Sequence, residues 1–291
     1  MARLRTIAGV VVLAAAALAA CRATPVPAAR SADRVTLLSD TTWPATPMGV
    51  AARRGHALLA HTPDSLPQYA HSALRCFNCH LDEGTRRNGL LLIGAAARYP
   101  QYRSRSNSVE LLADRVNDCF RRSLNGAALP LDGPDMRDII TYLSWVSRGV
   151  GVFDSVPGQG LPKMTPLKPD TASGAAIFAS ICSVCHRPDG QGSGIYPPLW
   201  GPRSFNIGAG MARLYTMASF VRNNMPFDKP GSLTDQQAFD VAAFVSSHPR
   251  PDYAAKATDW PNGNPPPDVA YPTAAAKRQP AAARTTPNGA H

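Results

Sequence analysis

The sequence predicts a mainly α-helical protein made of two similar domains in tandem. Two short cysteine motifs with the same spacing, residues 76–80 and 182–186, begin 106 residues apart. Each is flanked by segments that carry apolar residues at helical spacing, and a stretch rich in Gly and Pro, 149–168, lies between them. A length of 291 residues also suits two domains better than one.

Composition narrows the class of protein without fixing its function. Hydrophobic residues make up 44% of the chain, which is too many for a wholly disordered protein. No apolar run of about 20 residues follows the N-terminal region, so an integral membrane bundle is excluded. The formal net charge of +10 is compatible with binding to nucleic acid, a membrane surface or an anionic substrate.

The N-terminal residues indicate export. Arg3 and Arg5 precede an apolar stretch, 7–20, that is too short to span a membrane and has the layout of a signal peptide. The tetrapeptide that ends at Cys21, Leu-Ala-Ala-Cys, resembles a bacterial lipobox, which implies that Cys21 is diacylated and becomes the first mature residue. The alternative is ordinary cleavage nearby, with Cys21 incidental. We expect a periplasmic protein, anchored to a bacterial membrane by lipid alone.

The two cysteine motifs predict covalent haem. Both read C-x-x-C-H, the attachment signature of haem c, in which two thiols add to the porphyrin vinyl groups and the histidine binds the iron. A redox dithiol needs no histidine after it, a zinc site would need all four sulfurs close together, and structural disulfides are the remaining alternative. We therefore expect two haem c groups. The attachment residues are Cys76, Cys79, Cys182 and Cys185, and the proximal iron ligands are His80 and His186.

Each half then has the layout of a class I-like cytochrome c domain. In the first, 46–150, helices are expected at 47–61, at 108–124 and from Pro134 onward, with Gly55 and Leu59 placed to meet the last of them. The preceding residues, 22–45, would form a flexible tether.

The second domain, 169–250, follows a linker at 151–168. Its expected helices lie at 172–181, at 211–224 and after a capping box formed by Thr234 and Gln237. Gly174 and Phe178 would make the same kind of helix contact as Gly55 and Leu59. The remaining residues, 251–291, are rich in Pro and Ala, and we expect an extended or disordered tail in which only Trp260 and Tyr271 could attach to a domain.

The sixth iron ligand of the second haem is expected to be Met225. It lies 39 residues after His186, just beyond a helix, where class I cytochromes c place their axial methionine. Met211 and Met217 are the alternatives, although both fall at the start or inside of that helix. The carbonyl of Pro198 is expected to accept the hydrogen bond of the proximal imidazole.

The first domain has no methionine in the matching region, and Cys119 stands there instead. It also lies 39 residues after its proximal histidine. A buried free cysteine is the alternative, and the rival ligands are His56, His61, His71, Met48 and Met136. A thiolate ligand stabilises ferric iron, so electrons should pass from the Cys119 haem to the Met225 haem.

Basic residues are concentrated around Cys119. Eight arginines lie between positions 86 and 122 against three acidic residues. Arg115, Cys119 and Ser123 are spaced by four residues and share one helix face, and arginine suits a tetrahedral oxyanion because its planar fork donates two hydrogen bonds. The alternative is a solvated face that docks an acidic partner or lipid head groups. A nucleic-acid partner is not expected, because no recognition motif is present and the N-terminal residues indicate export.

These residues resemble those of the bacterial diheme thiosulfate dehydrogenases, which form tetrathionate. The matching stretches are 75–82, 97–105, 114–126, 197–205 and 223–226. The resemblance implies that Cys119 is both haem ligand and substrate-facing sulfur, and that Arg105, Arg115 and Ser123 hold thiosulfate. Some members carry a lysine beside the distal methionine that exchanges with it on reduction. Asn224 occupies that position here, so no such exchange is expected.

The expected activity is the oxidation of two thiosulfate ions to tetrathionate, with the electrons passed to a soluble cytochrome c or similar acceptor. Two alternatives remain open at this point. One is a lipid-anchored electron carrier without catalytic activity, and the other is a cytochrome subunit of a larger sulfur-oxidising complex.

Overall fold

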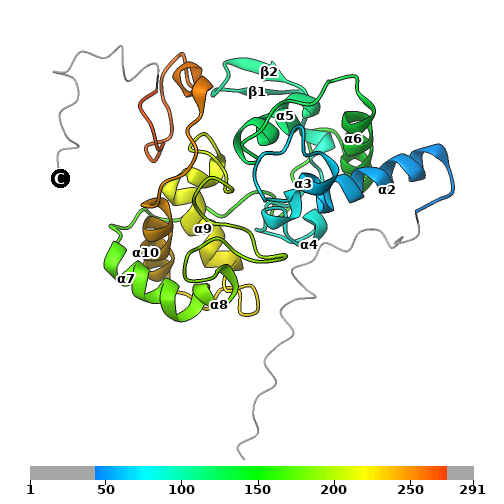
Figure 1. Ribbon diagram of the computed structural model, residues 1–291. Helices are drawn as coiled ribbons and strands as arrows, with labels where there is room; N and C mark the ends of the chain where they lie inside the picture. Colours follow the sequence, from blue (N-terminus) through cyan, green and yellow to red (C-terminus); the bar gives the residue numbers. More distant parts are fainter. Residues whose placement is uncertain (1–42, 274–291) are drawn as a thin grey trace, which may run out of the picture.

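The computed structural model describes residues 43–273 (Figure 1). The predicted signal peptide, Cys21 and most of the predicted tether lie outside the described residues, as do residues 274–291 of the predicted tail. Within the described part, no helix is long and apolar enough to cross a membrane.

The described part of the N-terminal half contains three helices of 11 to 14 residues, a two-stranded sheet and several short helical turns. The sheet is antiparallel and pairs Tyr102 with Val109. The elements are α2 (Pro47–Ala60), α3 (Thr62–Ser65), η1 (Cys76–Asn78), α4 (Leu81–Gly84), η2 (Ala96–Arg98), β1 (Gln101–Arg103), β2 (Ser108–Glu110), α5 (Leu112–Arg122) and α6 (Pro134–Val146).

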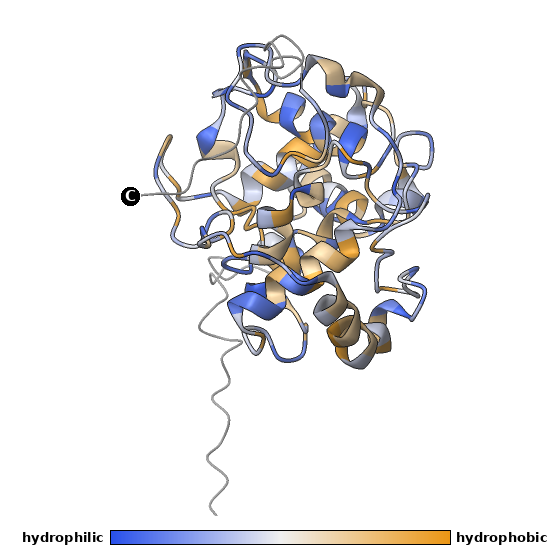
Figure 2. Ribbon diagram, turned by 90° about the vertical axis from the view of Figure 1, so that its left-hand side faces the viewer, coloured by the Kyte–Doolittle hydropathy of each residue, from blue (hydrophilic) through white to orange (hydrophobic). Residues whose placement is uncertain are grey.

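The C-terminal half is helical. Its elements are α7 (Thr171–Ile177), η3 (Phe178–Cys182), α8 (Ser183–His186), η4 (Gly210–Ala212), α9 (Leu214–Asn224), α10 (Asp235–Ser246) and η5 (Ala254–Thr258). The predicted capping box begins α10: the Thr234 hydroxyl accepts from the Gln237 N–H, and the Gln237 side chain accepts from the Thr234 N–H. In Figure 2 the helices in the middle of the molecule carry orange and tan segments beside blue ones, whereas much of the loop backbone at the rim is blue, as expected for amphipathic helices around a core.

The same helix crossing occurs in both halves, and a glycine makes each one possible. A Cβ atom on Gly55 of α2 would lie 2.0 Å from the Asp138 carbonyl oxygen of α6. A Cβ atom on Gly174 of α7 would lie 2.0 Å from the Asp240 carbonyl oxygen of α10. No side chain fits at either point, so the two glycines set how closely the first and last helices of each half approach.

The helix predicted at 108–124 begins later than expected. Residues 108–110 form strand β2, and α5 starts at Leu112. Leu111, which falls within the predicted helix, is 58% exposed, whereas Phe120 and Leu124 are buried. The β-branched Val109 and the cross-strand partner at 101–103 favour the extended conformation locally, a non-local pairing that helical spacing alone does not reveal.

The segment after α10 is ordered against the rest of the molecule as far as residue 273. It contains the short helix η5, and Asp259, Trp260, Tyr271 and Thr273 are all buried. Trp260 and Tyr271 are thus attached, as the sequence suggested, but the expected extended or disordered conformation is wrong for residues 251–273. The reason is that polar contacts with arginines of the N-terminal half fix this apolar-poor segment.

Candidate haem and substrate site

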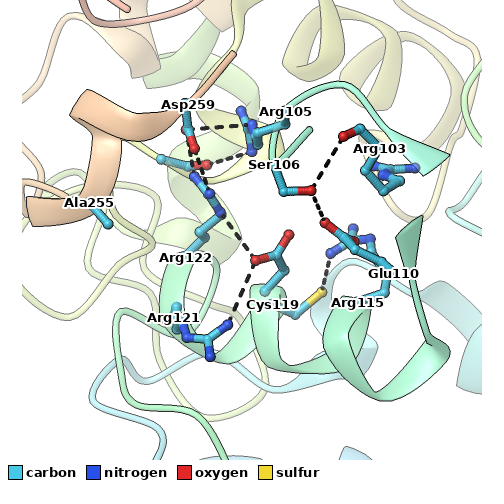
Figure 3. A network of polar contacts seen from close by, with 12 residues as sticks. Arg103, Arg105, Ser106, Glu110, Arg115, Cys119, Arg121, Arg122, Ala255 and Asp259 are labelled. Carbon is cyan, nitrogen blue, oxygen red and sulfur yellow. Dashed lines mark hydrogen bonds and ion pairs between the residues drawn. The ribbon is translucent and has the colours of Figure 1, made fainter. Parts of the chain in front are cut away.

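The first site is built on helix α5. Arg115 and Cys119 lie one turn apart on the same face, and the Arg115 Nη1 atom donates to the Cys119 Sγ atom at 3.0 Å (Figure 3). The negative charge of the Cys119 sulfur is the largest influence on the guanidinium, and it raises the pKa of Arg115. The predicted pairing of a sulfur with an arginine on one helix face is therefore present.

The same sulfur acts electrostatically on the first cysteine motif. Burial raises the pKa of the Cys76 and Cys79 thiols to about 12, and the charge of Cys119 adds to the increase at both. Arg115 in turn contributes to lowering the pKa of His80. The fold thus gathers Cys119, Arg115 and the C-x-x-C-H motif into one site, although 39 residues separate Cys119 from His80.

The proximal histidine of this motif is oriented by the backbone. The His80 Nδ1 atom is hydrogen-bonded to the Leu90 carbonyl oxygen, which leaves Nε2 free for a metal. Burial lowers the pKa of His80 to about 4, so the imidazole is neutral at physiological pH. A neutral imidazole with its second nitrogen fixed by a carbonyl is the form that ligates iron.

The second site repeats this arrangement with one difference from the prediction. The His186 Nδ1 atom lies 3.0 Å from the Pro197 carbonyl oxygen, not from that of Pro198 as expected. The Pro198 carbonyl instead accepts from the Ser204 hydroxyl, because successive carbonyls of the extended chain point in different directions. Burial lowers the pKa of His186 and raises that of Cys182 to about 11.

The residues of both motifs fit covalent haem c. All four cysteines are free and half-buried, and burial opposes a thiolate at Cys76, Cys79 and Cys182. A sulfur in a thioether bond to a porphyrin carries no charge, so the bound form is compatible with a buried position. Within residues 43–273 no group of three or more His, Cys, Asp or Glu side chains could hold a metal ion, which disfavours the zinc alternative for this part of the chain.

The alternative iron ligands considered for the first haem are exposed, buried in the core or in contact with other side chains. His56 packs against the rings of Trp43 and Phe77, and its Nε2 atom lies 3.1 Å from Glu83. His61 and His71 are exposed. Met48 is 64% exposed, and Met136 is buried in the hydrophobic core.

In the second site Met225 follows the last residue of α9 and is half-buried. Of its rivals, Met217 is buried in the core, where its sulfur receives a contact from the Ser246 hydroxyl. Met211 lies in η4, before α9. The position of Met225 just beyond the helix is the one expected of a distal ligand.

Comparisons with known proteins agree with this geometry. Residues 68–152 match the family described as SoxA/TsdA, cytochrome c domain, and residues 169–245 match cytochrome c oxidase, cbb3-type, subunit III. The chain is 41% identical to a thiosulfate dehydrogenase of Psychrobacter arcticus over 79% of its own length and 72% of the relative. It is 43% identical to one of Allochromatium vinosum over 70% of its own length and 80% of the relative.

The chain belongs to the thiosulfate dehydrogenase family. A solved structure of thiosulfate dehydrogenase TsdBA from Marichromatium purpuratum superposes with a TM-score of 0.72 and 34% identity. It matches 76% of this chain, which spans about half the length of that protein. The predicted family, the two tandem cytochrome c domains and the two haem c cofactors are confirmed.

The other two predicted substrate residues, Ser123 and Arg105, lie on different elements. Ser123 is the C-terminal cap of α5, where its N–H donates to the Cys119 carbonyl oxygen. Arg105 lies in the turn between β1 and β2. Its Nη1 atom donates to the Gly208 carbonyl oxygen at 3.0 Å, and none of its contacts within the described residues joins it to Cys119.

The sequence analysis did not identify two residues near this site, Tyr99 and Asp259. Tyr99 is half-buried, and burial raises its pKa, while the charges of Arg115 and Cys119 also act on it. It lies within the family-like stretch 97–105, but a lone tyrosine gave no reason to single it out. Asp259, 3% exposed, accepts two hydrogen bonds of 2.8 Å from Arg122. No local signal marks it, because its partner is 137 residues away.

Proposed function

We propose that this protein is a diheme thiosulfate dehydrogenase that couples two thiosulfate ions to tetrathionate. The observation that carries the proposal is the Arg115–Cys119 contact beside the first haem motif. Cys119 and His80 would hold the iron of the first haem. Met225 and His186 would hold the iron of the second. When bound, the two haems accept electrons one at a time and pass them on.

The chain's own residues bring two anions to one sulfur. Thiosulfate carries two negative charges, and a second thiosulfate must approach the first. Arg115, Arg105 and the Ser123 hydroxyl would hold the oxyanion groups and reduce that repulsion, which is large in a partly dry site. Arg115 is well suited, because it is half-buried and already lies 3.0 Å from the reacting sulfur.

The chemistry balances through a covalent intermediate on Cys119. The Cys119 thiolate and the outer sulfur of the first thiosulfate form a disulfide-type bond, and two electrons leave. A second thiosulfate then attacks the bound outer sulfur, which releases tetrathionate and restores the thiolate. Two thiosulfate ions thus give one tetrathionate and two electrons, with no net change at Cys119.

The proposed role of Cys119 is tested by the variant Cys119→Gly. In the purified diheme protein with ferricyanide as acceptor, this variant is expected to lose tetrathionate formation by at least about a hundredfold. Both haems should stay attached, since Cys119 is not an attachment residue. Ser180→Gly is a matched control, because Ser180 is exposed and its hydroxyl bonds only carbonyls of the preceding helix α7. Retained activity in Cys119→Gly would contradict the proposal.

The same assay separates the alternatives. Activity of the chain by itself excludes a purely electron-carrying cytochrome. Activity only after a partner protein is added favours the subunit of a larger complex. The proposed natural acceptor is a soluble cytochrome c, and the proposed location is the periplasm, with the lipid on Cys21 as membrane anchor.

A further inference from the structure

Arg105 depends for its position on a hairpin that is too small to be rigid. Strands β1 and β2 have three residues each, and Arg105 lies in the turn that joins them. An isolated two-stranded hairpin is at best marginally stable in water. Something else must therefore fix this turn if its guanidinium is to bind a substrate.

Residues 259–262, which we call the C-terminal clasp, hold the turn at three points. The Trp260 N–H donates to the Arg105 carbonyl oxygen at 2.8 Å. The Trp260 ring lies under the Arg105 guanidinium, 4.3 Å from its central carbon. The Asn262 amide donates to the Asn107 side chain at 2.7 Å.

The clasp is itself held firmly. Asp259 binds Arg122 of α5 through both of its oxygens and also accepts from the Tyr271 hydroxyl. Trp260 is 4% exposed and has a positive φ of 51°. A non-glycine residue adopts that conformation at a cost, and such residues persist where surrounding contacts impose them, often at functional sites.

The arrangement leaves part of Arg105 unused. Asp259 gives both oxygens to Arg122, so its nearest approach to Arg105 is a longer contact of 3.6 Å with Nε (Figure 3). The Nη1 atom donates to Gly208, and Nη2 makes no hydrogen bond within residues 43–273. A guanidinium fixed along one side and free at Nη2 is arranged to receive an anion.

We propose that the C-terminal clasp is part of the substrate site, and that Trp260 and Asp259 are positioning residues that hold Arg105 for a sulfur oxyanion. The clasp acts on binding and not on the sulfur chemistry, since no contact joins it to Cys119. This inference rests on the proposed function, in which Arg105 contacts thiosulfate.

The test compares two rings that lie on two arginines. Trp260 covers Arg105 at 4.3 Å, and Tyr253 covers Arg122 at 4.4 Å. Calorimetric titration of the fully reduced diheme protein with thiosulfate measures binding without turnover. Trp260→Leu is expected to weaken thiosulfate binding roughly three- to tenfold, because it removes the contact between the ring and the Arg105 guanidinium and makes the turn more mobile. Tyr253→Leu is expected to stay within about twofold of the unmodified protein.

Steady-state kinetics supply the second readout. Trp260→Leu should raise KM for thiosulfate by the same factor and leave kcat and haem content nearly unchanged. Equal affinity in Trp260→Leu and the unmodified protein, or equal weakening in both leucine variants, would overturn the inference. Should Trp260→Leu not fold, Trp260→Phe replaces it, with roughly two- to threefold weaker binding expected and unchanged affinity as the contrary result. If the unmodified protein neither binds nor oxidises thiosulfate, the proposed function fails instead.

Discussion

Arg115 is the residue whose charge acts most directly on the proposed chemistry. Its guanidinium touches the Cys119 sulfur, whereas Arg121, six positions along the same helix, is 45% exposed and lies 4.0 Å from Asp118. Position relative to the sulfur, and not charge alone, distinguishes these two arginines.

Replacing each arginine by glutamine removes one positive charge from the same helix. Arg115→Gln is expected to lower kcat/KM for thiosulfate about a hundredfold or more, as removal of a transition-state donor commonly does. Arg121→Gln should change it by no more than about twofold, because exposed charges are screened. Steady-state ferricyanide assays measure both. Equal losses in the two variants would show that only the overall charge matters.

Individual site residues could be predicted from the sequence where the spacing of nearby residues determines which side chains lie together. The haem motifs, the relation of Arg115 to Cys119 and the position of Met225 after a helix could all be predicted. Tyr99 and Asp259 could not, because each becomes part of a site only through contacts between distant segments. The carbonyl that orients His186 was misplaced by one residue, a detail set by backbone direction.

Among the elements, the close crossings of α2 with α6 and of α7 with α10 carry the most specific prediction. Gly174→Ala would place a methyl group 2.0 Å from the Asp240 carbonyl, so the helices would have to separate. The expected cost is about 1–3 kcal/mol in the free energy of unfolding, typical of overpacking. Denaturant unfolding of the holoprotein measures it.

Gly210→Ala is the control for this crossing. A Cβ atom at Gly210 would meet nothing within 4 Å, and its backbone does not require a glycine. Its stability should remain within about 0.5 kcal/mol of the unmodified protein. A Gly174→Ala variant as stable as Gly210→Ala would show that the two helices can move apart freely.

Helices α2, α6 and α10 were predictable because each has a regular apolar stripe and a clear start signal, namely Pro47, Pro134 and the Thr234 cap. The β1–β2 hairpin was not, because strands of three residues carry too little periodicity. The turn between them is hydrogen-bonded to the C-terminal clasp, a contact between segments far apart in the sequence.

Across the whole molecule, the two halves meet beside both haem sites. The Asn224 side chain, just before Met225, donates to the Asn88 carbonyl oxygen at 2.8 Å. Asn88 lies two residues before Leu90, whose carbonyl orients His80. Arg86 of the same loop lies over the ring of Phe227, 4.5 Å from its centre. The loop behind one haem motif is therefore bound to the segment that carries Met225.

This junction can be tested with neighbouring asparagines. Asn224→Ala removes a buried bond between the halves and is expected to lower the free energy of unfolding by about 1–3 kcal/mol. Asn223→Ala removes an amide that bonds only Ser219 of its own helix, and a smaller loss is expected. Denaturant unfolding gives both values, and equal losses would contradict a special role for the contact between halves.

The overall architecture of two tandem domains followed from the repeated motifs, whereas the way the halves join did not. A solvated basic face was the alternative interpretation of the arginine-rich stretch, yet Arg122 and Arg105 are largely buried against Asp259 and Trp260. Composition made the C-terminal segment resemble a disordered tail because it has few apolar residues. What anchors it is charge pairing and hydrogen bonding with the other half, which composition does not reveal.

The central claim is that the Cys119 sulfur binds the iron of the first haem inside an arginine-lined site. Low-temperature electron paramagnetic resonance of the oxidised diheme protein tests it most directly, since thiolate-ligated and methionine-ligated ferric haems have different low-spin signals. We expect one signal of each kind, with only the thiolate-type signal lost in Cys119→Gly. An unchanged pair of signals in that variant would contradict the claim.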